Sequence, residues 1–84
     1  MSANILYATR EELINARVKI LKSMDTYIRN NIDDEDVFDW WLAYGVPDDA
    51  DDDMLYDIAA IDNCWLCVVK CFAEIIKIEN GEVE

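Results

Sequence analysis

The chain alternates between amphipathic stretches and short polar breaks, with a spacing that predicts α-helices. Over residues 9–32, apolar side chains recur every three or four positions and cover about half of a helical circumference. Thr9 followed by Glu12 has the pattern of a capping box, which marks a helix start. A second helix is predicted over residues 34–44, because aspartates precede it and Gly45 follows it.

Two further helices are predicted in the second half of the chain. One spans residues 50–60 and follows an aspartate-rich run in which Asp49 is a candidate cap. The other spans residues 63–79, with Asp62 as its predicted cap, and is apolar over about two thirds of its circumference. A helix so widely apolar is typical of a central element or of a dimer seam. The expected fold is therefore all-α, a single domain over residues 1–84 built as a compact bundle of about four helices with the last helix central.

The same periodicity predicts which side chains face the core. The second helix is predicted to bury Trp41 and Tyr44, with Trp40 at the border of the buried face. Arg17 interrupts the apolar face of the first helix, and an unpaired buried guanidinium costs several kcal/mol. We therefore expect Arg17 to lay its stem along the core and to reach a carboxylate elsewhere in the chain. In the third helix the residues predicted to face inward are Met54, Leu55, Ile58 and Ile61.

Charge is distributed unevenly along the chain. The 19 Asp and Glu residues against 7 Lys and Arg give a formal net charge of −12. Residues 33–62 contain twelve acidic side chains and no basic ones. A segment this acidic repels a phosphate backbone, which argues against nucleic acid as a direct ligand and favours a basic protein surface or a metal ion as its complement.

Sequence signals of catalysis, export and membrane insertion are missing. The chain has no histidine and only two glycines, so it lacks the commonest general base near neutral pH and a glycine-rich phosphate loop. We therefore expect no catalytic residue and no cofactor. There is no basic leader followed by a long apolar run, and no membrane segment is expected. Three cysteines, an odd number, favour a reducing compartment, so the expected location is the cytoplasm.

Two groups of residues have a spacing that resembles metal ligands. Cys64, Cys67 and Cys71 would converge on one side of a helix. Apolar residues are interleaved with them and no fourth ligand is evident, so packing in the core is the favoured interpretation. An EF-hand loop in the aspartate-rich run would have Met54 at the glycine position and Ala60 in place of the bidentate glutamate. No dedicated metal site is expected.

Helix caps account for only part of the acidic segment. Carboxylates in the first turn stabilise a helix by about 0.3–1 kcal/mol each, which does not require five aspartates in the six residues from 48 to 53. Unpaired neighbouring carboxylates repel one another, so the surplus favours a partner outside the chain. Trp40 and Tyr56 border these charges, and aromatic residues in such positions are frequent interface anchors. The predicted partner-binding residues are Glu35, Asp36, Asp39, Trp40, Asp51, Asp52, Asp53, Tyr56 and Asp57.

In size, in the acidic segment 33–62 and in its lack of histidine and catalytic motifs, the chain resembles anti-CRISPR proteins and other small acidic DNA mimics. Phages and mobile elements make such inhibitors against host defence nucleases. The resemblance implies a non-enzymatic inhibitor that occupies the basic, nucleic-acid-binding surface of a Cas or similar enzyme. These inhibitors share no common fold, so no site residue is carried over from them. The alternative is a small helical adaptor or structural protein that forms a homodimer through the apolar face of the last helix.

Overall fold

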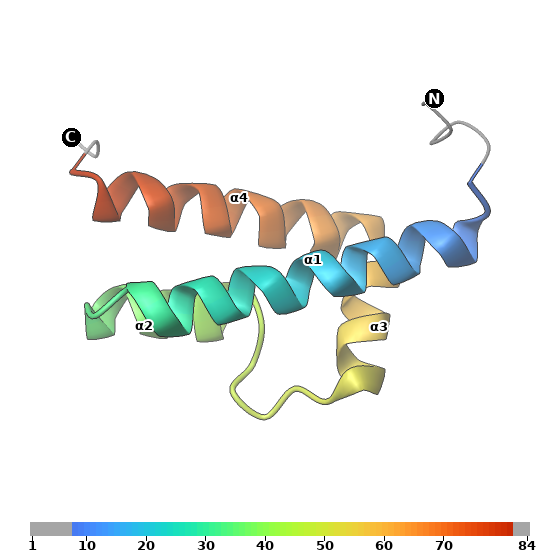
Figure 1. Ribbon diagram of the computed structural model, residues 1–84, viewed down its shortest axis with the longest axis horizontal. Helices are drawn as coiled ribbons and strands as arrows, with labels where there is room; N and C mark the ends of the chain where they lie inside the picture. Colours follow the sequence, from blue (N-terminus) through green and yellow to red (C-terminus); the bar gives the residue numbers. More distant parts are fainter. Residues whose placement is uncertain (1–7, 82–84) are drawn as a thin grey trace.

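The computed structural model describes residues 8–81, which form four α-helices joined by short connections (Figure 1). The helices are α1 (Arg10–Asn31), α2 (Glu35–Tyr44), α3 (Asp52–Ala60) and α4 (Asp62–Glu79). The described part of the chain contains no β-strand. The all-α prediction is confirmed, and every predicted helix boundary lies within two residues of the observed one. The ends of the predicted domain, before residue 8 and after residue 81, lie outside the described residues.

Side-chain caps explain where three of the helices begin. Thr9 and Glu12 form the predicted capping box at the start of α1. The Asp34 carboxylate accepts hydrogen bonds from the backbone of α2. The cap of α3 is Asp51, whose carboxylate accepts from the Met54 N–H at 2.9 Å, so the prediction of Asp49 was wrong. A capping carboxylate must lie within one turn of the N–H groups that it satisfies, and α3 begins two residues later than predicted.

The start of α4 also differs from the prediction. Asp62 is the first residue of this helix rather than its cap, and Ile61 occupies the cap position without a side-chain hydrogen bond. The Asp62 carboxylate instead accepts a hydrogen bond from Arg17 at 2.8 Å. An ion pair with another helix has therefore taken the place of a local cap.

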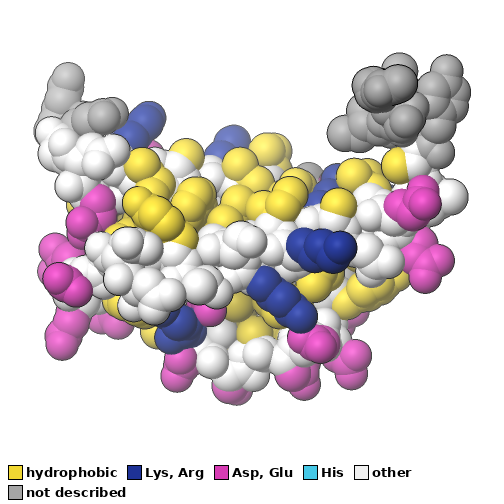
Figure 2. All heavy atoms as spheres, in the orientation of Figure 1, with side chains coloured by type: hydrophobic (Ala, Val, Ile, Leu, Met, Phe, Trp, Pro, Cys, Tyr) yellow, Lys and Arg dark blue, Asp and Glu magenta, His cyan; other side chains and the backbone are white. Residues whose placement is uncertain are grey.

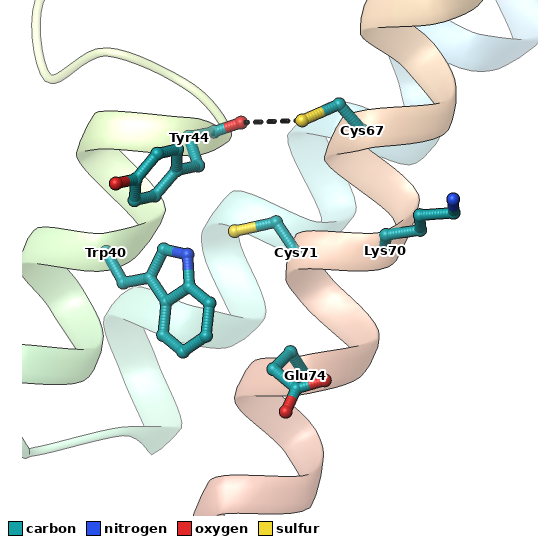
Figure 3. A pocket seen from close by; sticks show the side chains of 6 residues that line it. All are labelled: Trp40, Tyr44, Cys67, Lys70, Cys71 and Glu74. Atoms are coloured by element: carbon teal, nitrogen blue, oxygen red, sulfur yellow. Dashed lines mark hydrogen bonds between the residues drawn. The ribbon is translucent and has the colours of Figure 1, made fainter.

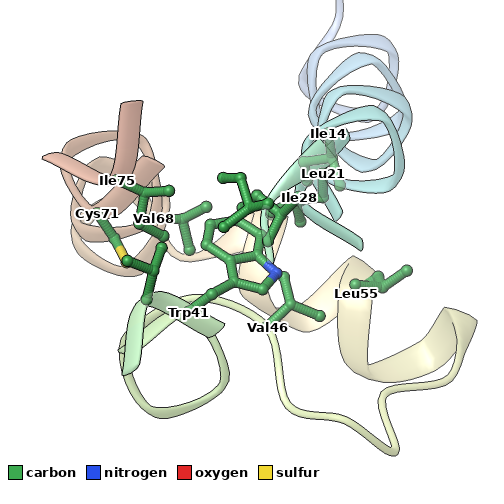
Figure 4. Packing of buried hydrophobic residues seen from close by; sticks show 12 residues of the cluster. Ile14, Leu21, Ile28, Trp41, Val46, Leu55, Val68, Cys71 and Ile75 are labelled. Carbon is green, nitrogen blue, oxygen red and sulfur yellow. The ribbon is translucent and has the colours of Figure 1, made fainter. Parts of the chain in front are cut away.

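Trp41 lies at the centre of the core. Its side chain has 0% of its surface exposed, and Figure 4 shows it between buried residues of α1 and α4. Its indole Nε1 donates a hydrogen bond to the Asp25 carboxylate at 2.9 Å, which satisfies its polar group. The buried residues are Ile14, Leu21, Ile28, Ile32, Val37, Trp41, Val46, Leu55, Ala59, Val68, Cys71 and Ile75.

The four helices contact one another to different extents. α1 packs against α3, while α4 packs against both α2 and α3. α1 and α4 lie side by side in Figure 1, and the Tyr27 and Phe72 rings connect them in an edge-to-face pair with 5.9 Å between centroids. The last helix is thus central in the sense that it contacts the other three. Its outer stripe nevertheless remains exposed, and Leu66 on that stripe is 52% exposed.

Several residues predicted to face inward lie at the surface instead. Tyr44, Met54 and Ile61 are exposed, and Tyr44 most of all, at 61%. The short helices α2 and α3 are covered along one stripe only, so residues at the border of that stripe stay in solvent. The predicted compact helical bundle is thus confirmed, with these three side chains left at its surface.

Candidate acidic interface

The first group of predicted site residues lies on α3. Asp51 caps the helix, and Asp52 and Asp53 occupy its first turn, where the helix dipole favours carboxylates. Asp57 follows Asp53 by four residues, so these two carboxylates share one stripe of the helix. Tyr56 is 41% exposed on the same short helix. The fold thus brings five predicted residues together within two turns.

The α3 carboxylates differ in whether they form an ion pair. Asp52 lies 3.1 Å from the Lys22 ammonium, but both side chains are more than half exposed, so the pair contributes little to stability. Asp53 and Asp57 form no ion pair with any residue in the described range. Their charges are therefore uncompensated within residues 8–81 and available to a partner.

The second group lies on α2. Glu35 and Asp36 occupy the first turn behind the Asp34 cap, and both are exposed. Asp39 is exposed one turn later. Trp40 is half-buried, as predicted for a residue at the border of the core, and its ring meets that of Tyr44 edge to face at 6.2 Å between centroids. No ion pair within the described chain involves Glu35, Asp36 or Asp39.

The two groups do not merge into one continuous patch. α2 begins where α1 ends, at one end of the long axis, whereas α3 lies toward the other end (Figure 1). Figure 2 shows acidic side chains along the edge of the molecule formed by α2, α3 and the segment between them, and at both ends of the long axis. The acidic surface therefore consists of two clusters with the connecting residues 45–51 between them.

One acidic residue that the prediction left out has an intramolecular role. Asp48, in the segment between α2 and α3, lies 3.3 Å from the Arg29 guanidinium. Arg29 also donates a hydrogen bond to the Asp25 carboxylate at 2.8 Å, and this bond is the main cause that raises the pKa of Arg29. The spacing of Asp25 and Arg29 by four residues could have been recognised in the sequence, but the Asp48 contact depends on the path of the connecting segment.

The prediction for Arg17 is confirmed. Its guanidinium donates to the Asp62 carboxylate and to the Ala59 carbonyl oxygen, both at 2.8 Å. The guanidinium also lies over the Trp65 ring, 5.5 Å from its centroid. The hydrogen bond and the charge of Arg17 lower the pKa of Asp62 below its ordinary value. Arg17 thus joins α1 to the junction of α3 and α4.

A groove between α2 and α4 was not predicted from the sequence. It has a volume of about 630 Å³ and is lined by Trp40, Tyr44, Cys67, Lys70, Cys71 and Glu74 (Figure 3). The spacing of Trp40 and Tyr44 by four residues indicated a shared stripe, but Tyr44 was assigned to the core. The groove places the predicted anchor Trp40 beside an opening at the surface.

The cysteines are not all packed in the core as predicted. Cys71 is buried, whereas Cys64 and Cys67 are exposed, and the Cys67 thiol lies 3.9 Å from the Tyr44 carbonyl oxygen. Burial, with a smaller effect from Cys67, raises the pKa of the Cys71 thiol to about 11. Only the Cys71 side of α4 faces the neighbouring helices, which is why equal spacing on one helix did not give equal burial. Among residues 8–81, no three His, Cys, Asp or Glu side chains are placed to hold a metal ion together.

The three cysteines are expected to differ in how fast they react with thiol reagents. In the native protein at neutral pH, Cys64 and Cys67 should react rapidly with the chromogenic disulfide DTNB, because both are exposed. Cys71 should react only after denaturation, because it is buried and little of its thiol is ionised when its pKa is about 11. A Cys71→Ala variant should show the same rapid reaction in native protein and no additional thiol in guanidinium. Rapid reaction of all three thiols would contradict the observed burial.

Comparison with known proteins leaves the function of this surface to be argued from its own geometry. None of the described helices is both long and apolar enough to cross a lipid bilayer. No protein-family model, curated protein or solved structure matches the chain.

Proposed function

We propose that this protein is a non-enzymatic acidic inhibitor that occupies a basic, nucleic-acid-binding surface of a protein partner. The observation that carries this proposal is the small number of internal counterions. Of the twelve carboxylates in residues 33–62, three form ion pairs, namely Asp48, Asp52 and Asp62. The other nine are exposed and have no ion pair within the described chain. Such an arrangement destabilises the isolated protein and is relieved by a cationic partner.

The spacing of the free carboxylates supports a resemblance to a nucleic acid. Glu35 and Asp39 on α2, like Asp53 and Asp57 on α3, are four residues apart on a helix. Side chains at this spacing lie about 5–6 Å apart at their Cβ atoms, which is of the same order as the ~3.4 Å of helix axis that each phosphate of one DNA strand occupies. A channel lined with Lys and Arg would accept these clusters and lose access to its own substrate.

The partner class follows from the same charges. A protein whose binding surface is basic because it holds DNA or RNA, such as a Cas nuclease or another defence enzyme, matches the acidic clusters. Opposite charges would steer the two proteins together, so association should be fast and sensitive to salt. The proposal includes no catalytic residue, cofactor, direct nucleic-acid ligand or membrane. It places the protein in the cytoplasm of a host cell, as expected of a phage or mobile-element product.

A charge-neutralising double variant tests the proposal. The carboxylates of Asp53 and Asp57 have no ion pair within residues 8–81, so Asp53→Asn with Asp57→Asn should leave the fold intact. Asp51 stays unchanged because it caps α3. Against a purified nuclease that the natural protein blocks, we expect binding to weaken by about 1–3 kcal/mol and to depend less steeply on salt. The measurements are association rates at several salt concentrations and a mobility-shift assay of nucleic-acid binding by the nuclease.

The matched control removes the same charge elsewhere. Glu11→Gln with Glu79→Gln also removes two exposed carboxylates, but these lie outside the acidic segment. This control should reduce the association rate only slightly. The proposal fails if both double variants weaken binding equally, or if none of a panel of Cas and other defence nucleases is inhibited by the natural protein at low salt.

A further inference from the structure

A second surface of the molecule is apolar and lies between α1 and α4. Figure 2 shows hydrophobic side chains gathered in a band along these two helices, away from the edge where the acidic side chains lie. On α4 half-buried residues recur every three or four positions and so share one stripe of the helix, namely Trp65, Val69, Phe72 and Ile76. On α1 the same spacing places Leu13, Arg17, Ile20, Met24 and Tyr27 on one stripe, from which Arg17 contacts Trp65 and Tyr27 contacts Phe72. We call this surface the α1–α4 groove.

Two contacts between long side chains connect α1 and α4 across this surface. Arg17 contacts the Trp65 ring near one end, and Tyr27 contacts Phe72 further along. Beside the Tyr27–Phe72 pair lies a depression of about 440 Å³, lined by Lys19, Ile20, Ser23, Met24, Tyr27 and Phe72. Two large apolar side chains that line this depression remain open to solvent, with Ile20 at 44% and Tyr27 at 45% exposure. A contiguous exposed apolar surface of this kind is characteristic of a binding site.

The basic residues at the margin of the groove indicate the charge of its occupant. Arg17, Lys22 and Arg29 each pair with an aspartate, and Arg10 donates to the Ala60 carbonyl oxygen. Three exposed lysines form no ion pair within the described chain, namely Lys19, Lys70 and Lys77. In a chain with 19 acidic residues, unpaired lysines are not explained by a shortage of partners.

These lysines are placed along the two rims. Lys19 lines the depression from α1. Lys70 and Lys77 share the outer stripe of α4 with Leu66, because these residues are separated by four and seven positions. Lys70 also lines the groove between α2 and α4, and Figure 3 shows its side chain extending from α4 away from Trp40 and Tyr44. The apolar band therefore has one unpaired lysine on its α1 side, and two more lie on the outer stripe of α4 beyond its other border.

We propose that the α1–α4 groove binds an amphipathic helix of a partner protein, with an apolar stripe for the floor and carboxylates along its flanks. Two helices side by side form a trough in which a third helix can bury its apolar stripe, which is an established mode of peptide recognition. The three lysines select for acidic flanks by charge complementarity. The proposal is independent of the proposed function, because it concerns a different surface and a partner of opposite charge.

A second copy of this chain is a less suitable occupant. A symmetric dimer presents the same patch from both sides, so it would bring the unpaired lysines of one copy toward those of the other. Each copy also carries a net charge of −12, which opposes close association. An acidic helix from another protein avoids the first conflict and turns the lysines into attractive contacts.

The test uses the full chain and two synthetic helical peptides of about 18 residues, long enough to span the groove. Both carry the same leucine stripe, and their flanks carry either glutamate or glutamine. By calorimetry at low salt, the glutamate peptide should bind with one-to-one stoichiometry and about tenfold more tightly than the glutamine peptide. The net charge of −12 would favour the glutamine peptide over the glutamate peptide. A preference for the glutamate peptide would therefore come from the lysines near the groove. Replacing them by Lys19→Gln, Lys70→Gln and Lys77→Gln should abolish the preference.

Variants of the floor complete the test. Ile20→Ser with Tyr27→Ser, two exposed residues that line the depression, should weaken both peptides by at least about tenfold, whereas Tyr44→Ser with Met54→Ser, two exposed apolar residues outside the groove, should leave both affinities unchanged. Circular dichroism verifies the fold of each variant. The proposal is overturned if neither peptide binds, if the two bind equally, or if the floor variant has no effect. It is also overturned if sedimentation shows a dimer of the chain alone that the floor variant dissociates.

Asp53→Asn with Asp57→Asn should not alter peptide binding. Failure of the groove proposal and failure of the acidic interface are therefore distinguishable.

Discussion

Replacing Trp41 with alanine is expected to destabilise the protein by about 3–5 kcal/mol, because a fully buried indole at the centre of the core is lost. A domain of this length has a total stability of roughly 4–13 kcal/mol. The variant should therefore be largely unfolded or melt far below the natural protein. Urea denaturation followed by far-ultraviolet circular dichroism measures the change.

Trp41→Phe provides the matched control for that experiment. Phenylalanine retains an aromatic ring that can pack against Phe72, whose centroid is 6.2 Å from that of Trp41. It removes the Nε1 donor to Asp25, but Asp25 keeps its hydrogen bond from Arg29. We therefore expect a smaller loss than for alanine, of about 1–2 kcal/mol. Equal stability of the alanine variant and the natural protein would show that Trp41 is not the centre of the core.

Arg17→Ala is expected to have the second largest effect. The change removes a hydrogen bond to the Ala59 carbonyl oxygen and the stacking of the guanidinium on Trp65. These losses should lower the free energy of unfolding by about 1–3 kcal/mol. Lys22→Ala is the control, because its ion pair with Asp52 is exposed on both sides and should contribute little. Equal effects of the two variants would contradict the role assigned to Arg17.

The effect of Arg17→Ala should also depend on pH. Arg17 lowers the pKa of Asp62 from its ordinary value of 3.8, so the ionised carboxylate is favoured in the folded state. This contribution is complete above the unfolded pKa and is lost as the pH falls through the lower folded value. The difference in stability between Arg17→Ala and the natural protein should therefore narrow below about pH 4. Melts at several pH values between neutral and acidic conditions measure it.

The two proposed surfaces have different charges and lie on different parts of the bundle. The acidic clusters belong to α2 and α3, whereas the α1–α4 groove is apolar with lysines at its rims. If both bind, one molecule would contact a basic protein and an acidic helix at the same time. Such a protein would connect two partners as well as block one of them.

The sequence by itself determined the helices and most of their boundaries. Apolar periodicity depends only on spacing along the chain, and the capping box of Thr9 and Glu12 involves residues three positions apart. The sequence also indicated that Arg17 pairs with a carboxylate, since a guanidinium on an apolar face requires a partner. The acidity of residues 33–62 is likewise a property of the sequence alone.

The tertiary structure decided which residues these local patterns bring together. Arg17 pairs with Asp62, 45 positions later, and that choice depends on how α1 meets the junction of α3 and α4. Tyr44 and Cys67 had the spacing of core residues but remain exposed, because α2 and α4 are covered by neighbours on one side only. The packing of the helices also separates the acidic residues into two clusters. It leaves the α1–α4 groove uncovered as well. Helical periodicity defines an apolar face, but only the packing of the other helices decides how much of that face is covered.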